Sequence, residues 1–264
     1  MRRSLFIAVV LVSALLAGCG QVGGKAAKLL ASPTDGLYEK AKSMITEGKV
    51  VDARAALQQI ITEHSDFKDI EQVEQDLYAL NIKFLFSDIP APQAVTHEVV
   101  LGDTLGKICR KYNVTMDLVK ASNGLGSDVV RLGQRLRVWS GKFSIVVNKT
   151  QNTLMLKSDE DIFKVYNVST GANASTPAGT FKITNKIENP VWYKQNAIIP
   201  PESPDNALGS RWMGLDKQGY GIHGTVQPDK IGQQITAGCV RMRNSDVEEL
   251  YKIVPVGTQV LIQE

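Results

Sequence analysis

The spacing of apolar residues changes several times along the chain, and these changes limit the fold to a series of modules. Between residues 36 and 85, apolar side chains recur every three or four positions, as they do on one face of a helix. Residues 86–95, FSDIPAPQAV, hold two prolines and few large apolar groups, which predicts a linker. Residues 142–264 are largely strand-like. A chain of 264 residues is long enough for several small cores, so we predict a multidomain α+β protein.

The segment 36–85 is predicted to be helical. Gly48 ends a first apolar face, Asp52 is placed to cap a second helix, and a third apolar face runs to Phe84. The stretch YEKAKSMITEGKVVDARAALQQI resembles a tetratricopeptide-like helix pair, with alanines where the helices cross and a glycine at the turn. A single pair buries little apolar surface. Two interpretations therefore stay open, a small helical spacer and a docking hairpin for a protein partner.

The first residues predict export. Two arginines precede an apolar run of about a dozen residues and then small residues, which is the pattern of a secretory signal over residues 1–18. LLAGC, residues 15–19, resembles a bacterial lipobox, which implies cleavage before Cys19 and lipid on its thiol. We expect an exported, lipid-anchored protein of the cell envelope, on the periplasmic face if the source is Gram-negative, with residues 19–35 as a flexible tether. An uncleaved anchor helix or an ordinary signal peptide is the alternative.

Charge and cysteine usage narrow the function classes. The formal net charge of +3 falls to +1 without residues 1–18, because that segment holds two arginines and no acidic residue. A nearly neutral chain with scattered basic residues gives no support for a nucleic-acid partner.

No cysteine, histidine and aspartate group has metal-ligand spacing and no glycine-rich phosphate loop is present, so we expect no metal and no other cofactor. Cys109 falls at an apolar position of a helical pattern, and a disulfide between Cys109 and Cys239 is an alternative.

Residues 96–140 have a pattern of their own. The order strand, helix, helix, strand is predicted, with strand and cap positions at Glu98–Leu101, Asp103 or Thr104, Thr115, Leu136 and Val138. The segment closely resembles a LysM module, which implies a βααβ unit that binds glycans containing N-acetylglucosamine. By that resemblance the glycan groove lies between the Gly102–Leu105 loop and the loop after Asn123, with contacts from Gly102, Asp103, Thr104, Leu105 and Asn123. A LysM fold that binds no sugar is the alternative.

Residues 142–264 are predicted to form a mostly-β sandwich or barrel-like sheet. A hairpin is expected over Asn148–Asn152, further strands over Gly179–Thr184 and Thr258–Ile262, and a helix over Asp246–Ile253. The stretch from Asn189 to Leu215 is expected to be a long loop. Long loops in compact domains often carry function.

Cys239, in ITAGCVRM, is the candidate nucleophile. A free thiol near pKa 8.5 is mostly protonated at neutral pH, so a nucleophilic cysteine needs a base. His64 and His97 are interpreted as surface residues, which leaves His223, in GYGIHGT, as the histidine of residues 142–264. Glycines beside both residues let backbone N–H groups approach an oxyanion. The spacing alone does not decide whether Cys239 is a nucleophile or a buried structural cysteine, and both interpretations are kept.

GYGIHGT followed by IGQQITAGCVRMRNSDVEELY strongly resembles the L,D-transpeptidase (YkuD-type) catalytic domain. The stretches STGANASTPAGTFKI, ENPVWY and LGSRWMGL match other parts of it, so the resemblance spans nearly all of residues 142–264. It implies Cys239 as nucleophile, His223 as its base and the Gly224 carbonyl as the group that holds the imidazole. It also implies that Arg241 pairs a substrate carboxylate or supports the site. Further substrate-binding positions are implied at Gly238, Thr236, Tyr220, Trp192, Arg211 and Trp212.

Ala237 departs from the family pattern, because many members carry histidine at that position. If that second imidazole were the essential base, this protein would be inactive. The physical argument prefers His223, since a base needs an orienting group and Gly224 supplies one. We therefore expect the loss of a histidine at position 237 to tune the site without abolishing activity.

The resemblance implies a two-step acyl transfer on peptidoglycan tetrapeptide stems. Cys239 forms a thioester and D-alanine leaves; a diaminopimelate side chain then gives a 3-3 crosslink, a lysine side chain anchors a protein, and water gives carboxypeptidase activity. The alternative from another class is a non-catalytic peptidoglycan-binding lipoprotein scaffold. The modules are expected to act separately, so that deleting residues 96–140 weakens wall binding and leaves acylation of Cys239 nearly unchanged.

Overall fold

The computed structural model describes residues 32–194 and 197–264. The predicted signal over residues 1–18, the lipidation site Cys19 and most of the predicted tether lie outside the described residues. No helix in this part of the chain combines the length and the apolar character that crossing a membrane requires.

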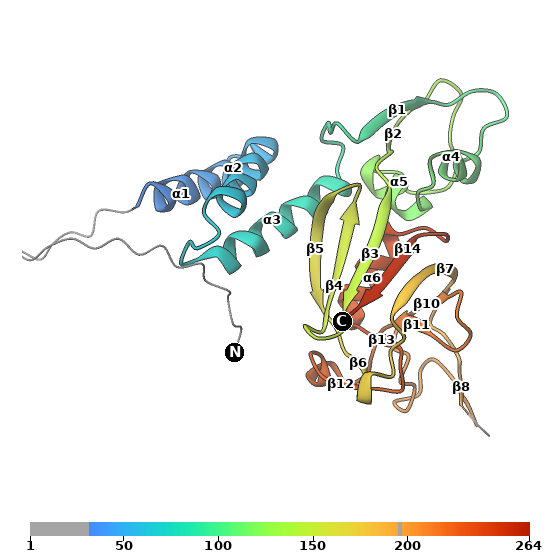
Figure 1. Ribbon diagram of the computed structural model, residues 1–264. Helices are drawn as coiled ribbons and strands as arrows, with labels where there is room; N and C mark the ends of the chain where they lie inside the picture. Colours follow the sequence, from blue (N-terminus) through green and yellow to red (C-terminus); the bar gives the residue numbers. More distant parts are fainter. Residues whose placement is uncertain (1–31, 195–196) are drawn as a thin grey trace, which may run out of the picture.

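The N-terminal module is a helical hairpin followed by a longer helix, α1 (Pro33–Thr46), α2 (Val50–Glu63) and α3 (Ile70–Leu85) (Figure 1). Helix α1 begins three residues before residue 36, the predicted start of the helical segment. The reason is a capping box, in which the Ser32 hydroxyl accepts the Asp35 N–H and the Asp35 carboxylate accepts the Ser32 N–H. Asp52 was also placed wrongly as a cap, because Lys49 occupies the cap position of α2 and Asp52 lies in the first turn.

The second module is the predicted βααβ unit, formed by β1 (Ala94–Glu98), α4 (Leu105–Tyr112), α5 (Met116–Ser122) and β2 (Arg135–Trp139). Strands β1 and β2 pair antiparallel, and Thr104 and Thr115 cap the two helices. The first strand ends at Glu98 and does not continue to Leu101 as predicted, and it begins within the predicted linker. The chain turns after Glu98 because the Asp103 carboxylate accepts the Val100 N–H and Gly102 has a φ of +90°.

The C-terminal module contains, in the described part of the chain, a sheet of eight strands in the order β13-β11-β10-β7-β14-β3-β4-β5, which are labelled in Figure 1. Its strands are β3 (Phe143–Asn148), β4 (Thr153–Ser158), β5 (Asp161–Asn167), β7 (Gly179–Glu188), β10 (Arg211–Leu215), β11 (Gly221–His223), β13 (Val240–Arg241) and β14 (Gln259–Gln263). The pairs β11–β13 and β14–β3 are parallel, and the other neighbours are antiparallel. Helix α6 (Asn244–Ile253) packs against β10 and β11. The predicted hairpin, the two further predicted strands and the predicted helix all occur, with β7 longer at its end.

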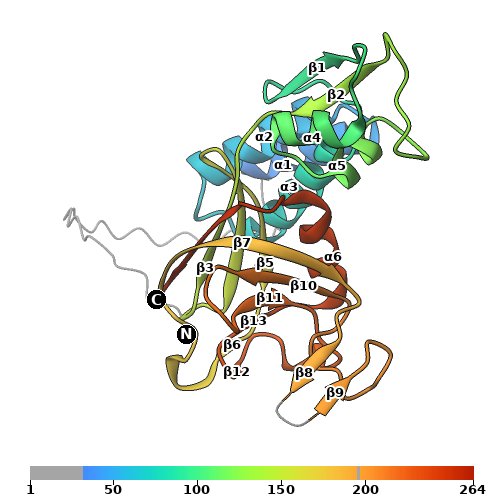
Figure 2. The same cartoon turned by 90° about the vertical axis from the view of Figure 1, so that its right-hand side faces the viewer.

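Short elements complete this module. Strand β6 (Thr170–Gly171) pairs with β12 (Gln234–Thr236), and the 3-10 turns are η1 (Ala172–Ala174) and η2 (Pro228–Lys230). The predicted long loop from Asn189 to Leu215 is wrong, because it contains the hairpin β8 (Trp192–Lys194) and β9 (Ala197–Ile199) as well as β10. The Asn206 amide donates to the carbonyls of Pro190 and Pro200 and so ties the base of this hairpin together. Figure 2 shows the hairpin at the end of the sheet farthest from β1 and β2.

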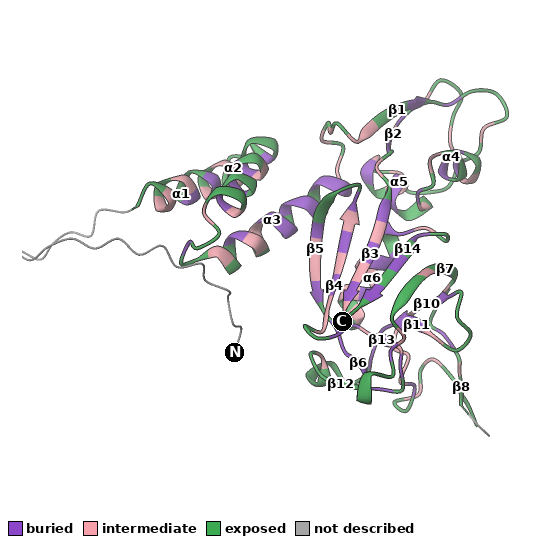
Figure 3. Cartoon of the chain, in the orientation of Figure 1, coloured by how far each residue is buried: buried purple, intermediate pink, exposed green. Residues whose placement is uncertain are grey.

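The three modules share one hydrophobic core. Trp139, the last residue of β2, is 1% exposed and contacts the rings of Phe84, Phe143 and Phe163, which come from α3, β3 and β5. The Arg137 guanidinium donates to the carbonyls of Phe84 and Leu85 at the end of α3 and of Ile89 in the segment that follows it. Figure 3 shows buried residues at this end of α3 and on the strands that it faces. Deleting residues 96–140 would remove Trp139 and Arg137 from this common core, so the expectation that acylation of Cys239 survives the deletion stays a prediction.

Trp139→Ala tests this junction. Truncating a fully buried tryptophan costs about 3–5 kcal/mol of unfolding free energy, and we expect that loss in urea denaturation of the whole chain. Leu132→Ala is the matched control in the same module, because Leu132 is 72% exposed and its loss is expected to cost under about 0.5 kcal/mol. Equal midpoints for the two variants would contradict the role given to Trp139 at this junction.

Candidate active site

Strands β11 and β13 bring His223 and Cys239 together from positions 16 residues apart in the sequence. In this parallel pair Ile222 lies beside Val240 and His223 beside Arg241. Cys239 directly precedes β13 and therefore lies at the level of Gly221. Because side chains alternate between faces along a strand, Cys239 and His223 point to the same face of the sheet as diagonal neighbours.

The loop from β12 to β13 fixes the conformation of Cys239. The Thr236 hydroxyl accepts the Gly238 N–H at 3.1 Å and donates to the Cys239 carbonyl at 2.7 Å. Gly238 has a φ of +132°, which side chains rarely adopt. A Cβ atom there would lie 2.7 Å from the Tyr220 ring and 3.1 Å from the Ser175 carbonyl. Thr236 and Gly238 thus shape the turn that presents Cys239.

The imidazole of His223 is held in one tautomer. His223 is 4% exposed, and its Nδ1 lies 2.7 Å from the Gly224 carbonyl oxygen. A carbonyl can only accept, so Nδ1 carries the proton and Nε2 of the neutral ring is left as a proton acceptor. The Trp212 indole stacks on the ring, with centroids 5.9 Å apart and planes at 21°. Gly221 makes room for that indole, because a Cβ atom there would lie 2.6 Å from it.

The surroundings keep the His223 imidazole and the Cys239 thiol neutral. Burial lowers the pKa of His223 to about 4, and the positive charge of Arg241 acts in the same direction, against hydrogen bonds to the Gly224 and Leu208 carbonyls. Burial raises the pKa of the Cys239 thiol, against a hydrogen bond from the Gly221 backbone and the charge of Arg241. At neutral pH the site therefore holds a thiol and a neutral imidazole. Such a pair reacts by general-base removal of the thiol proton during attack.

Cys239 opens into an apolar hollow of about 330 Å³. The wall residues come from the end of β7, the β8–β9 hairpin, β10 and the turn before β11, and are Ile187, Pro190, Val191, Trp192, Tyr193, Leu208, Trp212 and Gly219. The thiol lies 3.5 Å from the Gly219 carbonyl oxygen. Both cysteines of the described residues are free, so the alternative of a disulfide between Cys109 and Cys239 is excluded.

Arg241 borders a second, smaller hollow of about 150 Å³, together with Asp205, Thr225 and Gln227. Its Nε is buried and has no hydrogen-bond partner among residues 32–194 and 197–264. A buried donor without a partner is costly, so this guanidinium has capacity for an anionic or carbonyl ligand. No group of three metal-ligating side chains occurs in the same residues.

Two family models match the chain. The L,D-transpeptidase catalytic domain matches residues 142–262, and the LysM domain matches residues 97–139. The putative L,D-transpeptidase YkuD of Bacillus subtilis (strain 168) is 34% identical over 176 residues, which are 64% of this chain and 98% of that protein.

The chain belongs to the L,D-transpeptidase family.

Two further relatives and one solved structure are similar to parts of the chain. The putative L,D-transpeptidase YqjB of Bacillus subtilis (strain 168) is 44% identical over 46% of this chain and 70% of its own length. The probable L,D-transpeptidase YcfS of Escherichia coli (strain K12) is 28% identical over 61% of this chain and 59% of its own. Among solved structures, L,D-transpeptidase 3 from Mycobacterium tuberculosis aligns with a TM-score of 0.41 at 18% identity, over 50% of this chain and 66% of that one.

In this L,D-transpeptidase, Trp192, Trp212 and Tyr220 lie close to Cys239 as predicted, whereas Arg211 points away from it. Trp192 and Trp212 line the hollow beside Cys239, and Tyr220 covers Gly238. Arg211 instead pairs with Glu188 at 3.4 Å and lies over the Tyr251 ring of α6, because it alternates with Trp212 along β10. The substrate-binding prediction for Arg211 is therefore corrected to a structural contact.

Two of the predicted glycan-binding residues of the LysM module, Leu105 and Asn123, make structural contacts inside the module. Leu105 is 1% exposed, and the Asn123 amide bonds the backbone of Arg137 through both of its ends, at 2.7 and 2.8 Å. These two residues hold the module together. Asp103 lies 3.0 Å from the Nε2 of His97, which is 8% exposed, so His97 was wrongly interpreted as a surface residue. Exposed apolar side chains flank the two predicted groove loops, at Val100, Leu101, Val129 and Leu132.

Sequence reasoning missed Leu208 and Gly219, whose backbone carbonyls act on His223 and Cys239. A carbonyl contact carries no side-chain signal, so the pattern of residue types could not have revealed it.

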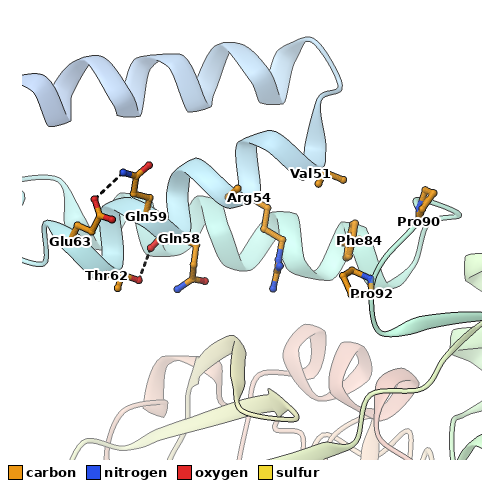
Figure 4. Close-up of a pocket in the computed structure, with 10 residues that line it drawn as sticks. Val51, Arg54, Gln58, Gln59, Thr62, Glu63, Phe84, Pro90 and Pro92 are labelled. Carbon is orange, nitrogen blue, oxygen red and sulfur yellow. Dashed lines mark hydrogen bonds between the residues drawn. The ribbon is translucent and has the colours of Figure 1, made fainter.

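A separate hollow of about 480 Å³ lies outside this site, between α2, the end of α3 and the linker. Arg54 and Gln58 point from α2 into it, and Phe84 and Pro92 form its other end (Figure 4).

Gly238→Ala is expected to lower the acylation rate of Cys239 by about 10-fold or more, because a methyl group displaces Tyr220 or the turn itself. The measurement is the second-order rate constant of acylation by a carbapenem, followed by intact mass. Gly232→Ala is the matched control, since Gly232 has a φ of +96° but nothing within 4 Å of its Cβ position. Equal rates in the two variants would contradict the role given to the Gly238 turn.

Proposed function

We propose that Cys239 is the nucleophile of this L,D-transpeptidase and that His223 is its general base. The observation that carries the proposal is the geometry of His223, whose Nδ1 donates to the Gly224 carbonyl while its neutral ring faces the same side of the sheet as the thiol. The exposed position of Ala237 supports the assignment, because a side chain there does not share the buried environment of the base. One imidazole is sufficient in this site.

The proposed reaction follows from these positions. Nε2 of His223 takes the thiol proton as Cys239 attacks the carbonyl of the L-centre residue before D-alanine in a tetrapeptide stem. The N–H of Cys239 is the donor that we assign to the oxyanion, because the Gly238 N–H is already bonded to Thr236. His223 then protonates the leaving amine of D-alanine, and a thioester remains. An acceptor amine attacks the thioester and gives its proton to His223, which restores the thiol as sulfur leaves.

The hollow lined by Cys239 and the smaller hollow lined by Arg241 suit the two parts of a stem peptide. The apolar, aromatic hollow next to Trp192 and Trp212 excludes water from the thioester. Arg241, with its unpartnered Nε, is the group that we assign to a stem carboxylate. An acyl-enzyme shielded from water favours transfer to an amine over hydrolysis, which supports 3-3 crosslinking or attachment of a protein lysine.

The remaining modules deliver the enzyme to its polymer. The LysM and L,D-transpeptidase domains imply peptidoglycan binding. We propose that glycan strands lie between the loops that carry Leu101 and Leu132, whose side chains are 91% and 72% exposed. We also propose export, lipid attachment at Cys19 and residence in the cell envelope, on the basis of the residue pattern at the N-terminus. A protein partner for residues 36–85 is proposed at the hollow below α2 (Figure 4).

Muropeptide analysis tests the proposed reaction. The whole chain is incubated with a defined disaccharide-tetrapeptide, and wild type is compared with Cys239→Ala. We expect crosslinked dimers and released D-alanine from wild type and neither from the variant. Tripeptides without dimers would make the enzyme a carboxypeptidase, and unchanged tetrapeptide would support the scaffold alternative.

A further inference from the structure

We propose that Asn244 is a positioning residue for the general base, acting through the peptide group between Gly224 and Thr225. The proposal rests on the proposed role of His223 as base. Asn244 is the first residue of α6 and was not among the predicted site residues.

The Asn244 side chain joins two loops behind the imidazole. Its Oδ1 accepts the Thr225 N–H at 2.9 Å and the Ser210 N–H at 3.2 Å. The Thr225 N–H and the Gly224 carbonyl belong to one peptide group. Because that group is planar and trans, its N–H and its carbonyl point in opposite directions. Asn244 therefore fixes one end of the peptide while the other end accepts the His223 Nδ1–H at 2.7 Å.

Two glycines make room for this contact. A Cβ atom at Gly209 would lie 2.3 Å from the Asn244 Oδ1, and a Cβ atom at Gly224 would lie 2.2 Å from it. Real Cβ atoms do not approach other atoms so closely, so the backbone at both positions is shaped around the carboxamide. Gly224 therefore offers its carbonyl to the imidazole and also leaves the space that the Asn244 carboxamide occupies.

The chemical consequence is control of the tautomer. With the Gly224 carbonyl held toward Nδ1, the ring keeps its proton there and presents an unprotonated Nε2 to the thiol. If the peptide turned away, Nδ1 would lose its acceptor and the Nε2–H tautomer, which cannot take a proton from Cys239, would become populated. Trp212 restrains the plane of the ring by stacking, but a stacked ring does not select a tautomer. Asn244 supplies that selection.

The test compares Asn244→Ala with Asn244→Asp in the full chain. Long-range ¹H–¹⁵N correlation spectra report the tautomer of each histidine, and the chain holds three. We expect the Nδ1–H form of His223 in wild type, a mixture in Asn244→Ala, and recovery of the Nδ1–H form in Asn244→Asp, whose carboxylate still accepts both N–H groups. Carbapenem acylation of Cys239 is expected to fall roughly 10- to 100-fold in the alanine variant, with most of the loss recovered in the aspartate variant.

Asn81→Ala is the control. Asn81 is a fully buried asparagine whose amide bonds Arg54 and the Phe163 carbonyl at the α3–β5 contact. It is expected to lose stability without changing the tautomer or the acylation rate. An Asn244→Ala variant with the wild-type tautomer and rate would overturn the proposal, as would a folded Asn244→Asp variant with the mixed tautomer. If wild type itself is not acylated, the proposed function fails, and the tautomer comparison still decides the positioning role.

Discussion

Cys239→Ala is expected to abolish covalent capture of acyl donors by this enzyme. The wild-type chain should gain one acyl group when it is incubated with a carbapenem, and the variant should gain none. Turnover of a tetrapeptide should fall by on the order of 10⁴-fold or more, because no other group in the site can form a thioester. Intact-mass spectrometry measures the adduct directly.

Cys109→Ala is the matched control for that experiment. Cys109 is 4% exposed and burial raises the pKa of its thiol to about 11, so it presents neither an accessible sulfur nor a reactive thiolate. We expect full acylation in this variant even if it loses some stability from its core. An adduct that persists in Cys239→Ala would contradict the assignment of the nucleophile.

His223→Gln is expected to lower the acylation rate by about 10²- to 10⁴-fold at pH 7 and to change its pH dependence. In wild type the reactive form has a neutral imidazole and a thiol. Because burial lowers the pKa of His223 to about 4 and raises that of Cys239, this form predominates from about pH 5 to pH 8. The wild-type rate should therefore be nearly flat over that range and should fall on acidification toward pH 4.

The variant should behave differently because it lacks the base. Its acylation must use the small fraction of free thiolate, which rises about tenfold with each pH unit below the thiol pKa. We therefore expect the acylation rate of His223→Gln to rise with pH, whereas the wild-type rate stays nearly constant between about pH 5 and pH 8. A wild-type profile with an acid limb near pH 6.5 would show that the imidazole titrates as in water and would contradict its burial.

The sequence singled out Cys239, His223 and the Gly224 carbonyl, which the structure brings to one site, but not the contacts of Leu208, Gly219 and Asn244. Cys239 and His223 were identifiable because thiol and imidazole chemistry depends on the residue type, and the glycines near them marked close backbone approach. Arg211 was placed wrongly because its motif, LGSRWMGL, does not reveal which face of β10 each side chain occupies. Trp212 next to it lies over His223, and Arg211 lies over Tyr251. A shift of one residue along a strand reverses the face, and only the observed register settles it.

The junction between modules was also beyond sequence reasoning. Trp139 follows a strand pattern, and Arg137 alternates with Leu136 and Val138 as an exposed residue would. Their partners, the Phe163 ring and the carbonyls at the end of α3, lie 24 or more positions away in the chain. Such tertiary contacts leave no local pattern. The short strands β8 and β9 were missed for a related reason, because three residues are too few to establish alternation.

Peptide mapping of the acyl-enzyme formed from a tetrapeptide stem tests the central claim most directly. The enzyme is mixed with a defined disaccharide-tetrapeptide, quenched in acid within the first turnover and digested. The account predicts a thioester on the peptide that contains Cys239, with a mass equal to the donor less D-alanine. An unmodified Cys239 peptide alongside released D-alanine, or an acyl group on any other residue, would contradict it.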